Sequence, residues 1–176
     1  SAVSQWRDKS GNGYDFNQAN AANQPVCMPS IINGYAVVRF DGTDDYFRLT
    51  RSIYPKVVFI VTAPTANALY DGIFGSFNPS DKGIRLENDT AWRSAGDPND
   101  FINGANGGIF VNGIATTSFG AAGTAHVMTA VRGSNTSVYI ESGLGLYFEQ
   151  RFFAGDIAEV LTFDAELTAV QRQAID

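Results

Sequence analysis

Short stretches in which every second residue is apolar recur along this chain, and turn residues separate them. Residues 84–87 alternate between apolar and charged side chains, and residues 137–141 follow the same period of two. Such alternation is typical of strands that bury one face of a sheet. The run at residues 57–62 is apolar on both faces, which predicts a central strand covered on either side. The pattern therefore predicts short strands in facing sheets.

Further strands are expected in segments rich in β-branched and aromatic residues, at residues 35–40, 46–49, 109–111, 126–131 and 157–163. Clusters of Gly, Asn, Asp and Ser lie between these segments and favour tight turns. The Asp-Gly step at residues 41–42 favours a turn directly after residues 35–40. It predicts that residues 35–40 and 46–49 form a hairpin. Roughly ten to twelve short strands at this spacing are typical of a sandwich.

The length of 176 residues suits one hydrophobic core, so a single domain is expected over residues 1–176. One short helix is predicted at the C-terminal end, where Thr168 and Gln171 match a capping box. A helix this short needs tertiary contacts for stability. The residues expected to dock it on the sandwich are Leu167, Val170, Ala174 and Ile175.

Charge disfavours nucleic acid as a partner, and the length of the apolar runs disfavours insertion into a membrane. Twelve Lys and Arg stand against eighteen Asp and Glu, without a basic cluster in the sequence, so nucleic acid is not an expected partner. Apolar runs fall well short of the ~20 residues that span a bilayer, so membrane insertion is not expected. Cys27 is the only cysteine, which excludes a disulfide within the chain, and a secretory signal is not recognisable at the start.

Several motifs, in a shared order, resemble those of one family of surface modules. At the N-terminal end they are VSQWRDKSGNG at residues 3–13, ING at 32–34, VVRFDG at 37–42 and DDYF at 44–47. At the C-terminal end, FAGDIAEVLTFD at residues 153–164 precedes the capped helix carrying Gln171 and Arg172. These motifs resemble the laminin-G-like and concanavalin A-like modules of bacterial and bacteriophage surface proteins.

The resemblance implies an antiparallel jelly-roll sandwich with one short C-terminal helix. It further implies a non-catalytic carbohydrate- or receptor-binding module of a larger surface protein, located extracellularly, on a cell surface or on a virion. Its partners would be a glycan or cell-surface receptor and other domains or subunits. Family members usually carry another strand before Trp6 and a longer closing helix, so the chain resembles an excised portion. Residues 65–124 match none of the motifs.

The stretch at residues 87–103 combines an indole, amides, carboxylates and an arginine. Sugars are recognised by such mixtures, because a ring face packs on C–H groups while amides and carboxylates bind hydroxyls. The candidate ligand-binding residues are Asn88, Trp92, Arg93, Asp97, Asn99 and Asn103. In an equally weighted alternative, Trp92 packs inward and the polar residues shape turns.

Calcium is the one cofactor that the resemblance suggests. Many laminin-G domains bind Ca²⁺ through an Asp in a loop before an alternating strand, and Asp81 occupies a comparable place. Lys82 beside it would oppose a cation, so a solvated loop is the favoured interpretation. Asp41, Asp44 and Asp45 do not have EF-hand spacing, so capping of a turn is the favoured interpretation.

An enzymatic role is not expected. A retaining glycosidase needs two carboxylates about 5 Å apart, whereas Glu159, Asp164 and Glu166 are separated by strand parity and a turn. His126 is the only histidine and is expected to be packed or on the surface. The alternative to ligand binding is a structural decoration or oligomerisation module, with an aromatic contact edge at residues 147–153.

Overall fold

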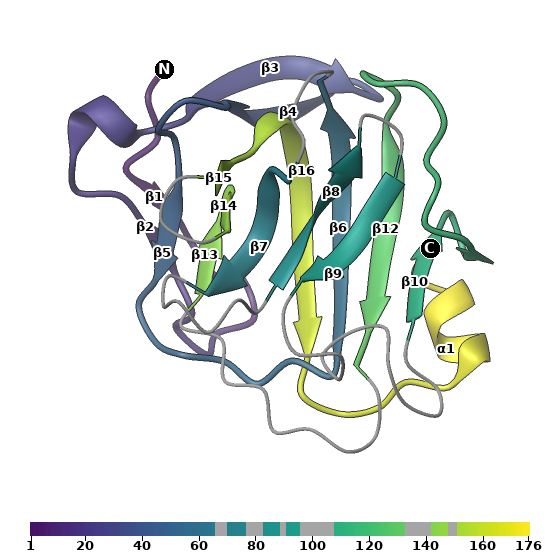
Figure 1. The fold of residues 1–176 in the computed structure, drawn as a ribbon. Helices are drawn as coiled ribbons and strands as arrows, with labels where there is room; N and C mark the ends of the chain where they lie inside the picture. The colour runs from purple at the N-terminus through teal and green to yellow at the C-terminus, as the bar shows by residue number, and fades with distance from the viewer. Residues whose placement is uncertain (66–69, 77–82, 89–90, 96–107, 133–141, 148–150) are drawn as a thin grey trace.

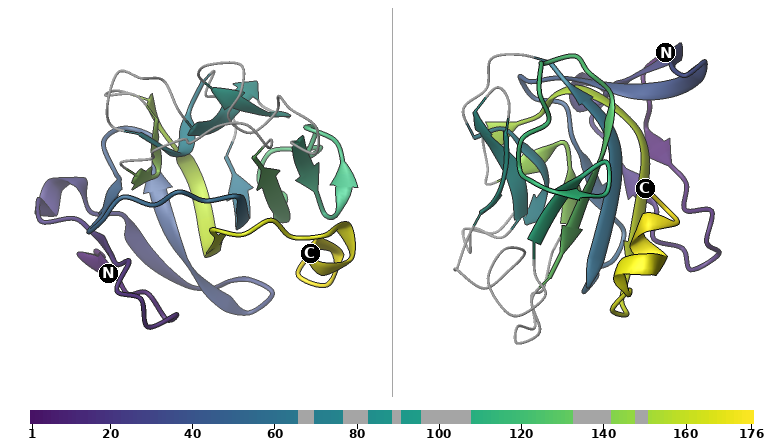
Figure 2. Two further views of the ribbon diagram at one scale, coloured as in Figure 1. Left: turned by 90° about the horizontal axis from the view of Figure 1, so that it is seen from below. Right: turned by 90° about the vertical axis from the view of Figure 1, so that its right-hand side faces the viewer.

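The computed structural model describes residues 1–65, 70–76, 83–88, 91–95, 108–132, 142–147 and 151–176. These residues are mostly strands, arranged in two facing sheets with a short helix beside them (Figures 1 and 2). This arrangement confirms the predicted all-β sandwich with one short helix.

The seven-stranded sheet is antiparallel, and its strands lie in an order different from their order in the chain. From one edge to the other they are β11 (Ile114–Ala115), β10 (Gly108–Val111), β12 (His126–Val131), β6 (Val57–Pro64), β16 (Ala154–Phe163), β4 (Tyr35–Asp41) and β3 (Val26–Ile32). The predicted central strand is confirmed, because β6 pairs with β12 on one side and β16 on the other.

The nine-stranded sheet has shorter strands, all antiparallel except for the pairing of β15 with β7. Its first members are β1 (Gln5–Trp6), β2 (Phe16–Asn17), β5 (Phe47–Leu49) and β7 (Gly72–Ser76). The others are β8 (Gly83–Asn88), β9 (Ala91–Ala95), β13 (Ser142–Leu144), β14 (Leu146–Tyr147) and β15 (Arg151–Phe152). A 3₁₀ turn, η1 (Ala21–Asn23), lies between β2 and β3.

The chain passes back and forth between the two sheets. β1 and β2 belong to the nine-stranded sheet, β3 and β4 to the other, and β5, β6 and β7 each lie in the opposite sheet from the strand before. β10 to β12, β13 to β15 and finally β16 continue this alternation. Each sheet is therefore assembled from segments far apart in the sequence.

The predicted hairpin of residues 35–40 with 46–49 is wrong. β4 pairs with β3 and β16, whereas β5 pairs with β2 and β13 in the other sheet. The Asp-Gly turn therefore carries the chain from one sheet to the other. The hairpin partner of β4 is β3, joined through Asn33 at φ 49° and Gly34 at φ 81°. Positive φ at both central residues suits the Asn-Gly step.

The main hydrophobic core lies between the sheets. The seven-stranded sheet contributes Val38, Phe40, Val58, Ile60 and Met128, all buried. The nine-stranded sheet contributes Phe47, Phe74, Ile84, Leu86, Trp92 and Leu144, also buried. The alternation predicted at residues 84–87 is confirmed for Ile84 and Leu86. The predicted strand at residues 137–141 lies outside the described residues.

The outer face of the seven-stranded sheet is also apolar and covered. Val57 and Phe59 of β6 point to this face and are buried, with 0% and 2% of their surface exposed. Partly buried Phe110, Leu161, Phe163 and Leu167 pack against them. A second outer cluster joins Ile32, Val37 and Ala63 with partly buried Met28, Val61 and Ala158. These two clusters explain why β6 is apolar on both faces.

The terminal helix α1 (Ala169–Gln173) has the predicted capping box, with Thr168 and Gln171 bonded reciprocally. Its predicted docking is largely wrong, because Ala174, Val170 (75% exposed) and Ile175 (37% exposed) face solvent. Of the four residues, Leu167 packs on the outer cluster, just before the helix begins. The other anchors are Arg172, whose Cζ lies 5.0 Å from the Phe110 ring centroid, and Asp176, which accepts a 2.6 Å bond from Thr129.

Candidate ligand-binding site

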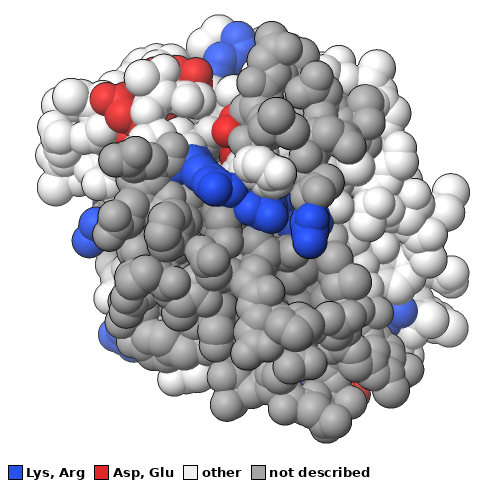
Figure 3. Space-filling view, in the orientation of Figure 1, with Lys and Arg blue, Asp and Glu red and all other residues white. Residues whose placement is uncertain are grey.

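The outer face of the nine-stranded sheet carries a group of arginines. In β8 and β9, Ile84, Leu86 and Trp92 point into the core, so Arg85 and Arg93 point outward by the alternation of a strand. Arg93 is exposed and Arg85 is partly buried. Figure 3 shows Lys and Arg atoms forming a row across the face that β7, β8 and β9 present.

Arg85 and Arg93 stand directly opposite each other in the antiparallel ladder. The N–H of Leu86 donates to Asp71 and its carbonyl accepts from Tyr70, while the N–H of Trp92 donates to Thr117. Leu86 and Trp92 are thus a pair without mutual hydrogen bonds. The neighbouring pair, Arg85 and Arg93, is then a hydrogen-bonded one, with Cα atoms about 5.5 Å apart. Like charges in such positions are unfavourable for the isolated sheet.

Tyr70 holds two guanidinium groups over one ring. The Cζ atoms of Arg85 and Arg151 lie 4.4 and 4.8 Å from its ring centroid. The two guanidinium groups are therefore close to each other, because both lie near the same ring centroid. Arg151 reaches this place because β15 runs parallel to β7, with Phe152 opposite Gly72. We call Tyr70, Arg85, Arg93 and Arg151 the arginine–tyrosine cluster.

The backbone of Tyr70 is strained, which is uncommon outside special sites. Its φ is 77°, in the left-handed region that residues other than glycine rarely adopt. Two backbone hydrogen bonds with Leu86, of 3.1 and 2.8 Å, hold the Tyr70–Asp71 segment in this conformation. The tyrosine ring, 37% of the residue being exposed, is thereby presented at the surface.

Asp71 contributes a carboxyl group beside the cluster. Burial raises the pKa of Asp71 to about 6, against the opposing effects of a backbone hydrogen bond from Ala154 and the charge of Arg151. Among the residues that the structure describes, none donates a hydrogen bond to its buried Oδ2 atom. The carboxyl group therefore changes charge in a mildly acidic range.

A pair of aromatic rings includes Phe152, which follows Arg151 of the cluster in sequence. Tyr46 stacks on Phe152, with ring centroids 6.2 Å apart and an interplanar angle of 30°. The Cζ of Arg48 lies 5.9 Å from the Tyr46 centroid. Tyr46 and Phe152 are partly buried and Arg48 is exposed. Arg48, Tyr46 and Phe152 therefore form a second group of a guanidinium and aromatic rings in the same sheet.

The structure separates the candidates that the sequence placed in one site. Arg93 lies at the surface within the cluster. Trp92, however, is 1% exposed and packs on Phe119 and Phe153, so its ring faces are not available to a ligand. The inward alternative for Trp92 is the one observed. Asn88 ends β8, and its side chain is outside the described part; Asp97, Asn99, Asn103 and the proposed calcium ligand Asp81 also lie outside it.

Trp92 and His126 form a polar link between the sheets. The indole Nε1 donates to His126 Nε2 at 2.9 Å. Since Nε2 accepts, Nδ1 carries the proton and donates to the carbonyl oxygen of Thr124 at 3.0 Å. His126 is 4% exposed and stacks on Phe119, and burial lowers its pKa. It is thus a packed neutral histidine that a substrate would not reach.

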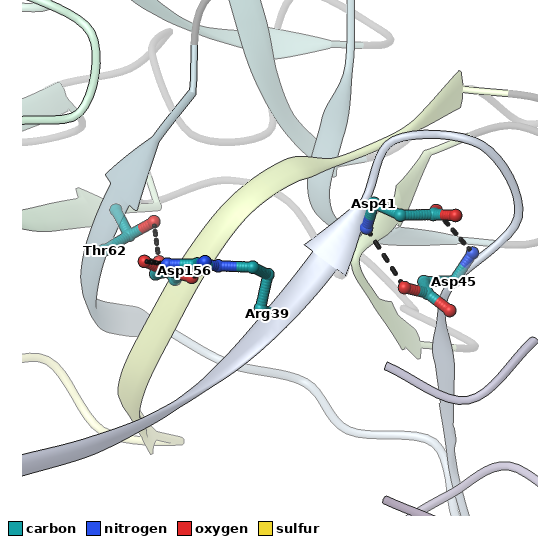
Figure 4. A network of polar contacts seen from close by, with 5 residues as sticks. All are labelled: Arg39, Asp41, Asp45, Thr62 and Asp156. Atoms are coloured by element: carbon teal, nitrogen blue, oxygen red, sulfur yellow. Dashed lines mark hydrogen bonds and ion pairs between the residues drawn. The ribbon is translucent and has the colours of Figure 1, made fainter. Parts of the chain in front are cut away.

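The acidic turn after β4 is a capped turn, as its spacing predicted. Asp41 Oδ1 accepts from the amides of Thr43 and Asp44. It also accepts from the Asp45 amide, and Asp45 Oδ2 accepts from the Asp41 amide (Figure 4). An oxygen from each carboxylate lies within 4.8 Å of the others. Burial, with the charges of Asp41 and Asp44, raises the pKa of Asp45 to about 6. The hydrogen bonds that the Asp41 and Asp45 carboxylates accept from backbone N–H groups account for the proximity of these side chains.

A second polar contact in Figure 4 also has a structural role. Arg39 of β4 forms a bidentate ion pair with Asp156 of β16, at 2.7 and 2.8 Å, and Thr62 of β6 donates to the Asp156 carbonyl. These bonds join three adjacent strands. Glu159 in β16, and Asp164 and Glu166 after it, are exposed.

Sequence reasoning missed Tyr70, Arg85 and Arg151 as members of one site. The outward position of Arg85 was visible in the alternation of residues 84–87. Tyr70 and Arg151, in contrast, meet only because β7 and β15 are neighbours in the sheet. Their proximity depends on a pairing that local patterns do not encode.

Comparison of the chain with family models, with curated proteins and with solved structures gives no match. In the part of the chain that the structure describes, every helix is too short and too polar to cross a bilayer. Function is therefore inferred from the geometry of the site.

Proposed function

We propose that the chain is a non-catalytic carbohydrate- or receptor-binding module, and that it binds through the outer face of its nine-stranded sheet. The observation that carries this proposal is the arginine–tyrosine cluster, in which Arg85 and Arg151 contact one ring and Arg93 stands opposite Arg85. Such a module would serve a larger bacterial or phage surface protein, outside the cell or on a virion. Its partners are a glycan or cell-surface receptor and neighbouring domains.

The chemistry of the cluster supports ligand recognition rather than catalysis. Guanidinium groups provide several donors in a rigid plane, which suits the hydroxyl and carboxylate groups of sugars. The exposed part of Tyr70 and the partly buried Tyr46–Phe152 pair add aromatic surface for C–H groups. The only histidine is buried and bonded to Trp92 and Thr124.

We further propose that the sandwich is a jelly roll of the laminin-G-like and concanavalin A-like type. The repeated passage of the chain between the two sheets supports this topology, because a jelly roll is wound from segments that alternate between its sheets. The motifs at both ends of the sequence are the second support.

A structural decoration module is the second candidate. Apolar side chains are exposed on the β3–β4 hairpin, with Val26 at 38%, Ile31 at 43% and Tyr35 at 74% exposure. They would suit contact with a neighbouring protein subunit. In this case the arginine–tyrosine cluster would have no glycan ligand.

A glycan array comparing the wild type with Arg93→Ala tests the first candidate. Arg93 is exposed, so its truncation should leave the fold intact, and we expect glycan signals of the wild type to be lost. Arg7→Ala is the matched control, because Arg7 is exposed beside β1, at the other end of the same sheet. Silence of the wild type on the array, together with self-association that Tyr35→Ser abolishes, would replace the first candidate by the second.

A further inference from the structure

Residues 1–6, which we call the strap, connect the end strands of the two sheets (Figure 1). Ala2 stands opposite Val26 in β3, the end strand of the seven-stranded sheet. Gln5 and Trp6 form β1, the end strand of the nine-stranded sheet, which pairs with β2. We propose that β2 and β3 form a strand-acceptor site, and that this site accepts the strap of a second copy of the chain in exchange for its own.

Backbone hydrogen bonds and two apolar side chains hold the strap on the acceptor site. The N–H of Val3 donates to the carbonyl of Pro25, and the N–H of Cys27 donates to that of Ser1, both at 2.8 Å. Val3 and Trp6 are partly buried and pack on the main core. The other four strap residues are exposed. The strap of another copy would supply the same bonds and the same side chains, so exchange preserves these contacts.

A glycine-containing loop joins the strap to β2. Residues 7–15 separate β1 from β2, and Gly11 and Gly13 have φ values of 86° and 75°. In the structure this loop turns the chain back on itself. Fully extended, at about 3.4 Å per residue, the same loop would span about 30 Å. It is therefore long enough to place the strap on an adjacent molecule, which is how exchanged dimers form.

Asp8 holds this loop in its closed conformation. Its carboxylate accepts from the N–H groups of Ser10 and Tyr14 at 2.8 and 3.1 Å, and from the Ser10 hydroxyl at 2.8 Å. These hydrogen bonds lower the pKa of Asp8 below its usual value. An exchanged strap needs an open loop, in which these bonds are absent. The bonds of Asp8 therefore favour pairing of the strap within its own molecule and oppose exchange.

The distribution of charge favours a second copy as the occupant. The chain has a formal net charge of −6, so two copies repel each other over much of their surface. Residues 16–38, which include β2, β3 and the start of β4, contain no charged residue, and residues 1–6 contain none either. The strap and its acceptor strands can therefore meet without repulsion. The structure also shows that the site fits this segment, which every copy carries.

The test is disulfide trapping between two full-length copies. Ala2 and Val26 are a pair without mutual hydrogen bonds, because the residues on either side of them form the bonds, so their Cα atoms are about 4.5 Å apart. A disulfide can span this distance. One copy carries Ala2→Cys and the other Val26→Cys, both with Cys27→Ala, and they are mixed at about 1 mM, where a neighbour competes with a tethered segment. After oxidation and trypsin digestion, we expect residues 1–7 of one copy linked to residues 10–39 of the other.

Three further variants serve as controls. A chain with both Ala2→Cys and Val26→Cys should form the disulfide within one molecule at low concentration, which verifies the position of the strap. Asn12→Cys, exposed in the loop, replaces Ala2→Cys in a mixture that measures random collision. Asp8→Ala should raise the rate of exchange about tenfold, because the loop loses hydrogen bonds to a charged group. Asp164→Ala, also exposed, should leave the rate unchanged. A circular dichroism melt of each variant excludes unfolding.

Several outcomes would overturn strap exchange. The first is an absence of linked peptide from the mixture while the double variant forms its disulfide within one molecule. A yield no higher than that with Asn12→Cys would show random collision, and failure of the double variant to form its disulfide would contradict the pairing of the strap with β3. Self-association that Tyr35→Ser abolishes, without the linked peptide, would assign the contact to the β3–β4 hairpin instead. None of these results depends on glycan binding, so they leave the proposed function standing.

Discussion

The two outer faces of the sandwich differ in chemistry although both belong to largely antiparallel sheets. On the seven-stranded sheet, Val57 and Phe59 point outward and are buried by Phe163 and Leu167. On the nine-stranded sheet, the outward residues of β8 and β9 include Arg85 and Arg93. The first face is thus a second core, and the second face is a surface. If the proposed function holds, stability and recognition depend on opposite sides of the molecule.

The largest expected effect is on the covered face. Phe59→Ala should lower the free energy of unfolding by about 3–5 kcal/mol, because it would leave a cavity in a packed cluster. Phe59 is 2% exposed and packs edge-on against Phe163, with ring centroids 5.9 Å apart. Urea denaturation monitored by tryptophan fluorescence would measure this. A loss below about 1 kcal/mol would mean that the outer cluster adds little, and the contrast between the faces would fail.

An effect of intermediate size on the free energy of unfolding, dependent on pH, is expected at the Trp92–His126 hydrogen bond that joins the two sheets. Burial lowers the pKa of His126 in the folded protein, so the unfolded chain takes up the proton first as pH falls. The stabilising effect of the neutral histidine is complete above its unfolded pKa of about 6.5, and it is lost as pH falls from there to the folded value. Stability should therefore decrease in this window.

The matched variant for this effect is His126→Gln, which can still accept from Trp92 and donate to Thr124 but does not titrate. The difference in unfolding free energy between wild type and variant should shrink as pH falls below 6.5. Taking the difference cancels the opposite contributions of Asp45 and Asp71, whose raised pKa values favour the folded state at lower pH. A difference that is constant from pH 8 to pH 5 would show that the link is not sensitive to protonation.

The smallest effect on stability is expected on the outer face of the nine-stranded sheet, which is the face proposed to bind the ligand. Arg93→Gln should change the unfolding free energy by less than about 0.5 kcal/mol, because the side chain is exposed. The same denaturation experiment measures it alongside Phe59→Ala. If Arg93→Gln proved as destabilising as Phe59→Ala, the arginine would be a structural residue, and the division of roles between the faces would be wrong.

The sequence predicted best what depends on neighbouring residues. The apolar run at residues 57–62 gave the central strand, and the Thr168–Gln171 pair gave the capping box. The Asp-Gly turn after Phe40 was recognised as a turn. Its consequence was misjudged, because turn residues do not specify whether the next strand joins the same sheet or the facing one. Pairing across the sandwich is decided by packing over long sequence distances.

The candidate site shows the same limit. The sequence placed Arg93 and its neighbour Trp92 together in a ligand-binding loop, whereas both belong to β9 and point to opposite faces. A period-two interpretation of residues 91–93 would have separated them. Tyr70 and Arg151 were beyond reach, since they are brought together by the parallel contact of β15 with β7.

The winding of the chain between the sheets has a consequence for folding. β4 pairs with β16, and β5 pairs with β13, although strands of the other sheet lie between these partners in the sequence. The two sheets therefore have to form together. Loops must close over long distances before their contacts form, which slows folding and makes partial states costly. We expect one cooperative, slow transition, so that each molecule is either intact on both faces or entirely unfolded.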